Sequence, residues 1–215
     1  ERIVQIRLTD QEGGLNLEGV SGSLSRSGFR VDADAELARA ICEAVAAEVE
    51  PGRILRSALS SISRALGAAP VALYLVGSDG VALQREAELE GSASGDRPTL
   101  PTDRGLTGTV CQSGRLVATD APAADARFDP RVDTAADGVA RGLLCVPIKL
   151  RDRVVGVLRV FFEDGNRPSP RTAEVLAAAI SAAVRNVLLY RSLLQSIEEL
   201  ATARREARGG AAPTR

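Results

Sequence analysis

The most constraining feature of the sequence is a pair of apolar runs between Arg141 and Glu163, RGLLCVPIKLRDRVVGVLRVFFE. A short charged stretch, residues 151–153, separates the two runs, and this arrangement predicts a β-hairpin. The second run is rich in valine and phenylalanine, which fit a pleated and half-buried surface. Because both runs are apolar throughout, we expect two central strands of a sheet that is covered on both faces.

Composition limits the class of protein. The chain has 215 residues, 45% of them apolar, which is enough to bury the core of one domain with extensions. Its formal net charge of −1 gives no basic footprint for nucleic acid. No unbroken apolar run approaches the roughly 18 residues of a membrane span, so we expect a cytoplasmic protein without a membrane segment. Cys42, Cys111 and Cys145 stand in apolar contexts, which suits core packing in a reducing compartment.

The chain contains no His and no Met. The absence of His removes the commonest general base, the usual proximal haem ligand and most zinc sites, so we predict no catalytic residue and no metal site. Neither paired catalytic carboxylates nor a Gly-x-Ser-x-Gly motif replaces it. A chain that starts at Glu1 without Met is expected to be part of a longer protein.

Three segments are predicted along the chain. Residues 1–33 are expected to be an N-terminal extension or the end of an upstream domain, with a strand over 2–9 and a linker over 21–27. The domain itself is expected over 34–200, and 201–215 are expected to form a flexible tail. Asp34 is predicted to cap a first helix, and Gly67 to end a second one. The apolar face of the first helix consists of Leu37, Ile41, Val45 and Val49.

The middle of the chain predicts strands at 71–76, 81–89 and 115–119, with a short helix that begins at Gly105 and ends at Ser113-Gly114. Residues 91–103 and 120–138 are expected to be loops. The second loop carries five aspartates and two arginines. Long loops inside compact domains are usually functional or disordered.

A long helix is predicted to start at Ser169-Pro170. Its apolar residues alternate spacings of three and four from Ala173 to Ala201, a sustained heptad pattern. We expect residues 176–183 to cover the sheet of their own domain, while the far end outruns the domain because a helix rises about 1.5 Å per residue. The far end is expected to form a parallel homodimer through Val187, Tyr190, Leu194 and Ile197, joined by Ile41 and Val45.

Three stretches, in this order, resemble the GAF domain family: LYLVGSDG at 73–80, GLTGTVCQSGRLV at 105–117 and DARFDPRVDTAADGVARGLLCVPIKLRDRVVGVLRV at 125–160. The resemblance covers residues 34–200. It implies an α+β fold, a six-stranded antiparallel sheet with the N- and C-terminal helices on one face and a ligand pocket on the other. It also implies a non-enzymatic sensory module that binds a small molecule and passes the signal through its C-terminal helix to an output domain.

The pocket is expected between the central strands, residues 106–111 and the loop 125–137. The family's cyclic-nucleotide motif is matched only at Phe128 and Asp133, so a cyclic nucleotide stays one alternative for an unidentified ligand. Bilin-binding members use a Cys beside a His, and here only Cys111 lies near the corresponding helix. No cofactor is assigned. The ligand-binding residues expected are Thr107, Val110, Cys111, Phe128, Asp129, Asp133, Arg141, Leu143 and Cys145.

Structural interpretations of these residues stay open. Cys145 suits a small core residue, and Phe128 either plugs the sheet face or contacts a ligand. Arg141 either pairs with Asp133 or Asp137 or holds a carboxylate or phosphate. Two other functions also stay open. One is a thiol reductase of free methionine sulfoxide, whose cysteine motifs this chain does not reproduce, and the other is a degenerate domain that only dimerises.

Overall fold

The computed structural model describes residues 26–68, 70–89, 98–135, 138–139, 141–163 and 165–209, with side chains from residue 34 to residue 205. The strand predicted over residues 2–9 lies outside the described residues, and so does Asp137.

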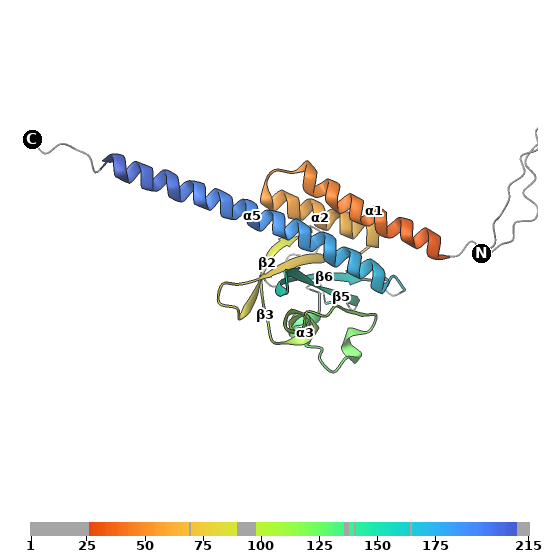
Figure 1. The fold of residues 1–215 in the computed structure, drawn as a ribbon. Helices are drawn as coiled ribbons and strands as arrows, with labels where there is room; N and C mark the ends of the chain where they lie inside the picture. The colour runs from red at the N-terminus through yellow and green to blue at the C-terminus, as the bar shows by residue number, and fades with distance from the viewer. Residues whose placement is uncertain are drawn as a thin grey trace, which may run out of the picture.

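A six-stranded antiparallel sheet organises the fold, with strand order β3-β2-β1-β6-β5-β4 (Figure 1). The predicted hairpin is confirmed, because β5 and β6 pair directly and each also has a second neighbour. The sequence missed β3, a three-residue strand inside an expected loop, which pairs with the start of β2. The strands are β1 Val71–Val76, β2 Ala82–Glu88, β3 Thr99–Pro101, β4 Val117–Thr119, β5 Gly142–Leu150 and β6 Arg153–Phe162.

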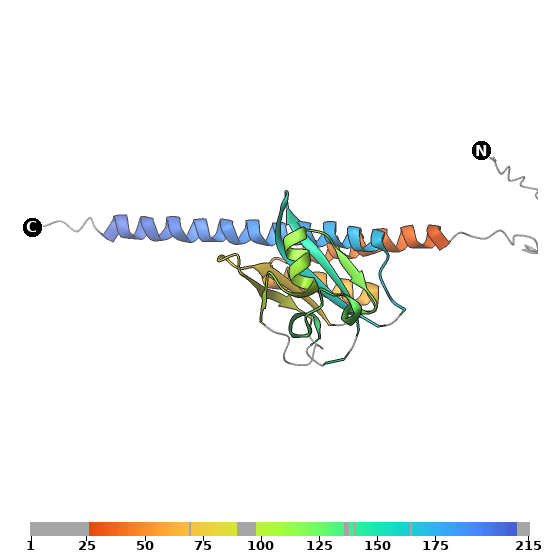
Figure 2. The same ribbon diagram turned by 90° about the horizontal axis from the view of Figure 1, so that it is seen from below.

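Two helices, α2 Pro51–Leu66 and α5 Pro170–Gly209, cover one face of the sheet, and α1 Arg26–Ala47 packs on these two helices (Figures 1 and 2). α2 ends as predicted at Gly67, which adopts the left-handed conformation with φ 57°. The first half of α5 packs on the sheet as expected, with Leu176, Ile180 and Ala183 buried against β5 and β6 side chains such as Val146.

The start of the first helix differs from the prediction. α1 begins at Arg26 and Asp34 lies inside it rather than capping it. No proline interrupts residues 26–47, so the helix continues upstream of the apolar pattern. The Asp34 carboxylate instead lies 3.6 Å from Nε of Arg171 on α5. Val49, expected on the apolar face, follows the end of α1 and is 75% exposed.

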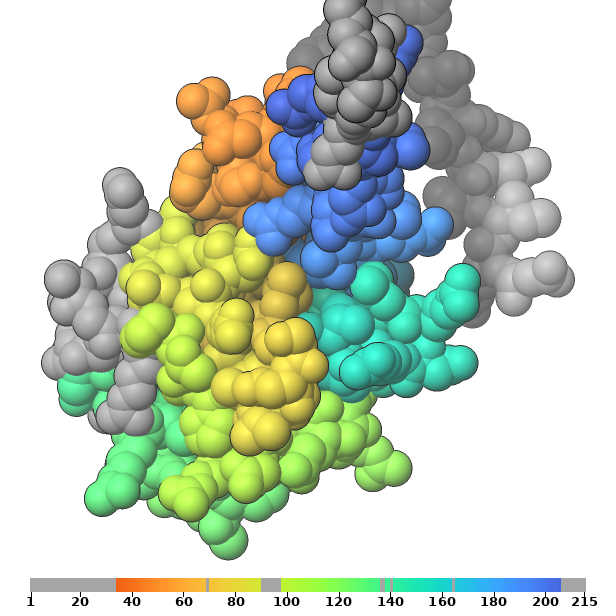
Figure 3. Space-filling view, turned by 90° about the vertical axis from the view of Figure 1, so that its left-hand side faces the viewer, coloured from red at the N-terminus to blue at the C-terminus, as the bar shows by residue number. Residues whose placement is uncertain are grey.

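The other face of the sheet carries α3 Gly105–Ser113, the 3-10 turn η1 Pro122–Ala124 and α4 Pro130–Asp133. The expected loop 120–138 therefore contains two short helical turns. A second core lies under them, formed by side chains such as Tyr74, Leu106, Leu143 and Phe161. Figure 3 looks from the C-terminal end of α5 and shows that helix and the green α3 region on opposite sides of the molecule.

The second half of α5 extends beyond the domain, past the C-terminal end of α1, which runs beside α5 in the same direction (Figures 1 and 2). By length and hydropathy alone, Pro170–Arg205 could cross a membrane, which qualifies the expectation that no segment could. A third of its most apolar window is buried inside the domain, and a core helix passes the same test, so this evidence for a membrane span is weak.

Candidate functional site

A buried carboxylate links the loop before β5 to α3. Asp133, the last residue of α4, accepts hydrogen bonds from the backbone N–H groups of Leu106 at 2.7 Å and Thr107 at 3.1 Å. It also accepts from Thr107 Oγ1 at 2.9 Å and from the N–H of Asp129 at 3.1 Å. The first turn of a helix has unsatisfied N–H groups and a positive dipole end, so a carboxylate is stabilised there. Asp133 thereby fixes α4 against the start of α3.

Gly105 makes this approach sterically feasible. Its φ is +72°, and a Cβ built on it would lie 2.5 Å from Oδ2 of Asp133. Any other residue would combine a strained backbone with a clash against the carboxylate. The position of Asp133, 28 residues further along the chain, therefore explains why α3 begins with a glycine.

A fully buried arginine lies beneath α4. Arg159, on β6, donates from Nη2 to the carbonyl oxygen of Val132 at 2.9 Å. Its guanidinium carbon lies 5.6 Å from the ring centroid of Tyr74 and 5.0 Å from that of Phe161, within the range of cation–π attraction. Sequence reasoning missed Arg159, although a charge between Leu158 and Val160 in a central strand was a signal for it.

Cys145 belongs to the same buried cluster. It pairs with Arg159 across β5 and β6, and its Sγ lies 3.6 Å from Oγ1 of Thr107. Burial raises the pKa of the Cys145 thiol to about 12, although the nearby Arg159 charge acts in the opposite direction. Burial also raises the pKa of the half-buried Cys111. Neither environment generates the thiolate that nucleophilic chemistry requires.

Thiol labelling checks this assignment. At pH 8, an aromatic disulfide reagent is expected to modify exposed Cys42 rapidly and Cys145 only when the protein unfolds. Mass spectrometry of digests reads each site, and Cys42→Ser should remove the fast phase. Cys145→Ala is expected to cost on the order of 1 kcal/mol of stability. Rapid modification of Cys145 in the native protein would contradict the assignment.

A cavity of about 360 Å³ adjoins the cluster. Three of the residues predicted from the sequence, Phe128, Asp133 and Arg141, contribute to its wall. Phe161 contributes a second aromatic side chain, so the cavity combines apolar walls with groups of both charges. Its lining consists of Asp120, Ala121, Pro122, Ala123, Phe128, Asp133, Thr134, Ala135, Gly138, Val139, Arg141 and Phe161.

The other predicted residues are not part of this lining. Cys111 is half-buried outside it, and Asp129 caps α4 by accepting from the N–H of Arg131 at 2.8 Å. The pocket was expected to reach under α3, but the side chains of Tyr74, Arg159 and Phe161 are buried there. Ligand binding by the predicted residues outside the lining stays a prediction. Four predicted residues are fully buried in the core: Thr107, Val110, Leu143 and Cys145.

Arg141 was predicted to pair with Asp133 or Asp137 or to hold an acidic ligand, and Asp137 lies outside the described residues. Asp133, one proposed partner, is engaged by α3 and by its own turn. Arg141 lines the cavity, where its guanidinium suits a carboxylate or phosphate. Within the described part of the chain, no three His, Cys, Asp or Glu side chains are grouped to hold a metal ion.

An antiparallel sheet with helices on one face, and a cavity beside short helical turns on the other, defines the GAF type of α+β domain. A model of the GAF domain matches residues 50–188, more than half of the chain, and the chain belongs to this family. No curated protein is similar enough to count as a match.

Solved GAF structures share the fold at low sequence identity. The GAF domain of an Acinetobacter phosphoenolpyruvate-protein phosphotransferase is 20% identical, with a TM-score of 0.61 over 76% of this chain and 97% of that one. Free methionine-R-sulfoxide reductase from Neisseria meningitidis, in complex with its substrate, is 20% identical, with a TM-score of 0.57 over 71% and 90%. A methyl-accepting chemotaxis protein segment is 18% identical, with a TM-score of 0.53 over 74% and 99%. The fold therefore occurs in signalling proteins and in an enzyme.

Proposed function

We propose that this chain is a non-enzymatic sensory GAF domain that binds a small molecule in the cavity beside α4. The observation that carries the proposal is the cavity itself, whose 360 Å³ lies at the lower end of the range of small-ligand sites. Its wall includes Phe128, Phe161 and Arg141, and such a mixture of apolar surface and a few polar groups is typical of ligand pockets. The ligand class that fits is a compact molecule with an apolar part and an acidic group, and a cyclic nucleotide stays one alternative.

The similarity to free methionine-R-sulfoxide reductases favours a thiol reductase as the second candidate. The chemistry of the cysteines argues against it, because burial keeps Cys145 protonated and Cys111 is not among the residues that line the cavity. Free methionine sulfoxide with a dithiol reductant tests this alternative directly. Turnover that Cys111→Ser or Cys145→Ser abolishes would establish the enzyme and overturn the sensory proposal.

The proposed output runs through α5 as a parallel homodimer. The sequence predicted that Val187 and Ile41 contact the partner. Each is only 1% exposed in the core of its own domain, so neither side chain is available to a partner. At about 100° per residue, the exposed apolar residues of α5 fall on one stripe. Such a stripe is normally hidden in an interface. The stripe consists of Leu189, Tyr190, Leu193, Leu194, Ile197 and Leu200, each between 36% and 71% exposed.

Ligand-dependent stabilisation tests the binding site. A metabolite panel is expected to contain a compound that raises the melting temperature, because a ligand at 100 times its Kd adds about 2.7 kcal/mol. Ala123→Trp should abolish this rise, since Ala123 is exposed and lines the cavity. Ala124→Trp is the matched control, because Ala124 is also exposed in η1 but is not part of the lining. Equal stabilisation of both variants would place the ligand elsewhere.

A further inference from the structure

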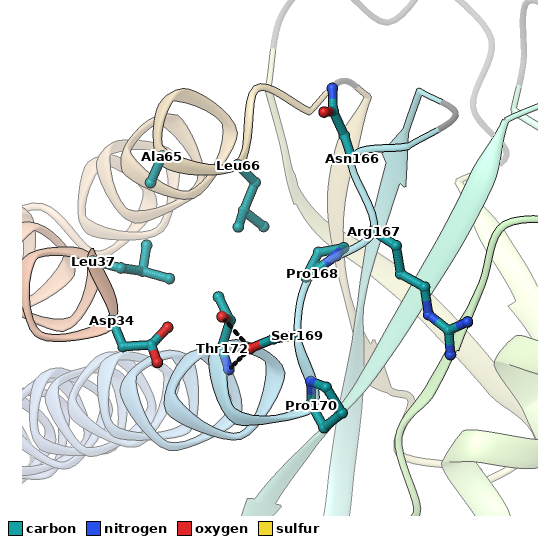
Figure 4. A pocket seen from close by; sticks show the side chains of 10 residues that line it. All are labelled: Asp34, Leu37, Ala65, Leu66, Asn166, Arg167, Pro168, Ser169, Pro170 and Thr172. Atoms are coloured by element: carbon teal, nitrogen blue, oxygen red, sulfur yellow. Dashed lines mark hydrogen bonds between the residues drawn. The ribbon is translucent and has the colours of Figure 1, made fainter. Parts of the chain in front are cut away.

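The connection from β6 to α5 lies between two cavities. One, of about 580 Å³, separates it from α1 and α2, where Leu37 and Leu66 line the opposite wall (Figure 4). The other, of about 700 Å³, separates it from α3 and β4. Three residues of the connection and the helix start line both cavities: Arg167, Pro168 and Pro170. The connection therefore has free space on two sides.

The connection is nevertheless stiff where it enters α5. Pro168 and Pro170 fix their own φ angles near −65°. Oγ of Ser169 accepts from the N–H of Thr172 at 3.0 Å and lies 2.7 Å from Oγ1 of the same residue (Figure 4). The carbonyl oxygen of Ser169 accepts from the N–H of Ala173 at 2.9 Å. A displacement of the connection is thus carried into the first turn of α5.

An ion pair joins this connection to the wall of the ligand cavity. Nη1 of Arg167 lies 3.4 Å from Oδ2 of Asp120. Asp120 lines the 360 Å³ cavity and directly precedes Ala121–Ala123, which also line it. In Figure 4 the Arg167 side chain points away from α1 and α2, toward the strands. A ligand in contact with residues 120–123 would therefore alter the position of Asp120, the ion-pair partner of Arg167.

A second ion pair continues from the start of α5 to α1. Arg171, the second residue of α5, lies 3.6 Å from the carboxylate of Asp34, whose side chain is 7% exposed. α1 and α5 run side by side in the same direction (Figure 1). A movement at Arg167 consequently affects both long helices of the domain.

We propose that the Asp120–Arg167 pair and the connection through Pro168 to Pro170 couple the cavity wall to the first turn of α5. This inference rests on the proposed function, since it assigns the route by which occupancy of that cavity reaches the output helix. Coupling between two sites is reciprocal, so loosening either end must loosen the other even without a ligand.

Amide hydrogen exchange of the full chain, followed by NMR without ligand, tests the coupling. In Asp120→Ala, the N–H groups of Thr172 and Ala173 are expected to exchange about two- to fivefold faster, the size that an exposed ion pair supports. In Arg167→Ala, the N–H groups of Ala124 and Asp125, which hydrogen bond within η1, should accelerate similarly. Reversing the charges together, Asp120→Arg with Arg167→Asp, should restore both rates. Amides of β1 and β6 serve as the reference for global unfolding.

Asp125→Ala is the matched control. Asp125 pairs with Arg127 at 2.6 Å in the same loop, and neither residue forms an ion pair with the described residues of the connection. This variant should accelerate the N–H of Arg127, which donates to Asp125, and leave Thr172 and Ala173 unchanged. Unchanged exchange at Thr172 and Ala173 in Asp120→Ala, or equal acceleration in Asp125→Ala, would overturn the coupling. Because no ligand is present, this failure is distinct from failure of the cavity to bind one.

Discussion

Replacing Asp133 with alanine is expected to lower the free energy of unfolding by about 3–5 kcal/mol. The carboxylate is 1% exposed and accepts four hydrogen bonds, so the change leaves N–H donors of α3 and of the turn without their acceptor. It also removes a negative charge that acts on the buried thiol of Cys145. For a chain of this size the melting temperature should fall by about 10 °C.

Asp129→Ala is the matched control, because Asp129 lies on the same turn and its side chain accepts one hydrogen bond, from the N–H of Arg131. Loss of such a cap typically costs about 1 kcal/mol. Urea unfolding of both variants measures the difference. If the two variants differ by less than about 1 kcal/mol, Asp133 does not hold α4 against α3.

Introducing Glu at both Leu194 and Ile197 is expected to weaken the α5 homodimer more than 100-fold. Each substitution would place a carboxylate inside an apolar interface, and burial of an unpaired charge costs several kcal/mol. The folded domain should survive, because both side chains are exposed in the single chain, at 42% and 53%. Sedimentation equilibrium is expected to show a dimer for the unaltered chain and a monomer for the variant.

Ser192→Glu with Gln195→Glu provides the control with the same added charge and the same spacing of three residues. At about 100° per residue, both positions lie well away from the apolar stripe, so the dimer should persist. A monomer before and after the Leu194 and Ile197 changes would refute the dimer. Dissociation by the control as well would show that charge alone, and not the stripe, controls assembly.

Much of the fold was readable from local signals. The unbroken apolar runs predicted the β5–β6 hairpin, and the serine before Pro170 predicted the start of α5. The short β3 escaped because three residues carry too little periodicity to be distinguished from a loop. The start of α1 was misplaced because polar residues at the upstream end of a helix resemble a linker.

The site was harder to predict than the fold. Phe128, Asp133 and Arg141 were selected because a long polar loop between strands indicates a functional region, and all three line one cavity. Their contact with a ligand stays a prediction. Thr107 and Cys145 were also predicted to bind a ligand. Both are fully buried in the cluster that contains Arg159 and do not line the cavity, so a role in binding stays a prediction. That packing depends on the pairing of Cys145 with Arg159 across the hairpin, which becomes visible only when the register is known.

Native mass spectrometry after incubation with a metabolite extract tests the central claim, ligand binding in the cavity, most directly. The unaltered chain and Ala124→Trp are expected to carry the same additional small mass, which dissociates on denaturation. Ala123→Trp, whose side chain would fill the cavity, is expected to carry none. An additional mass that Ala123→Trp retains, or no bound mass on any of the three proteins, would contradict the account.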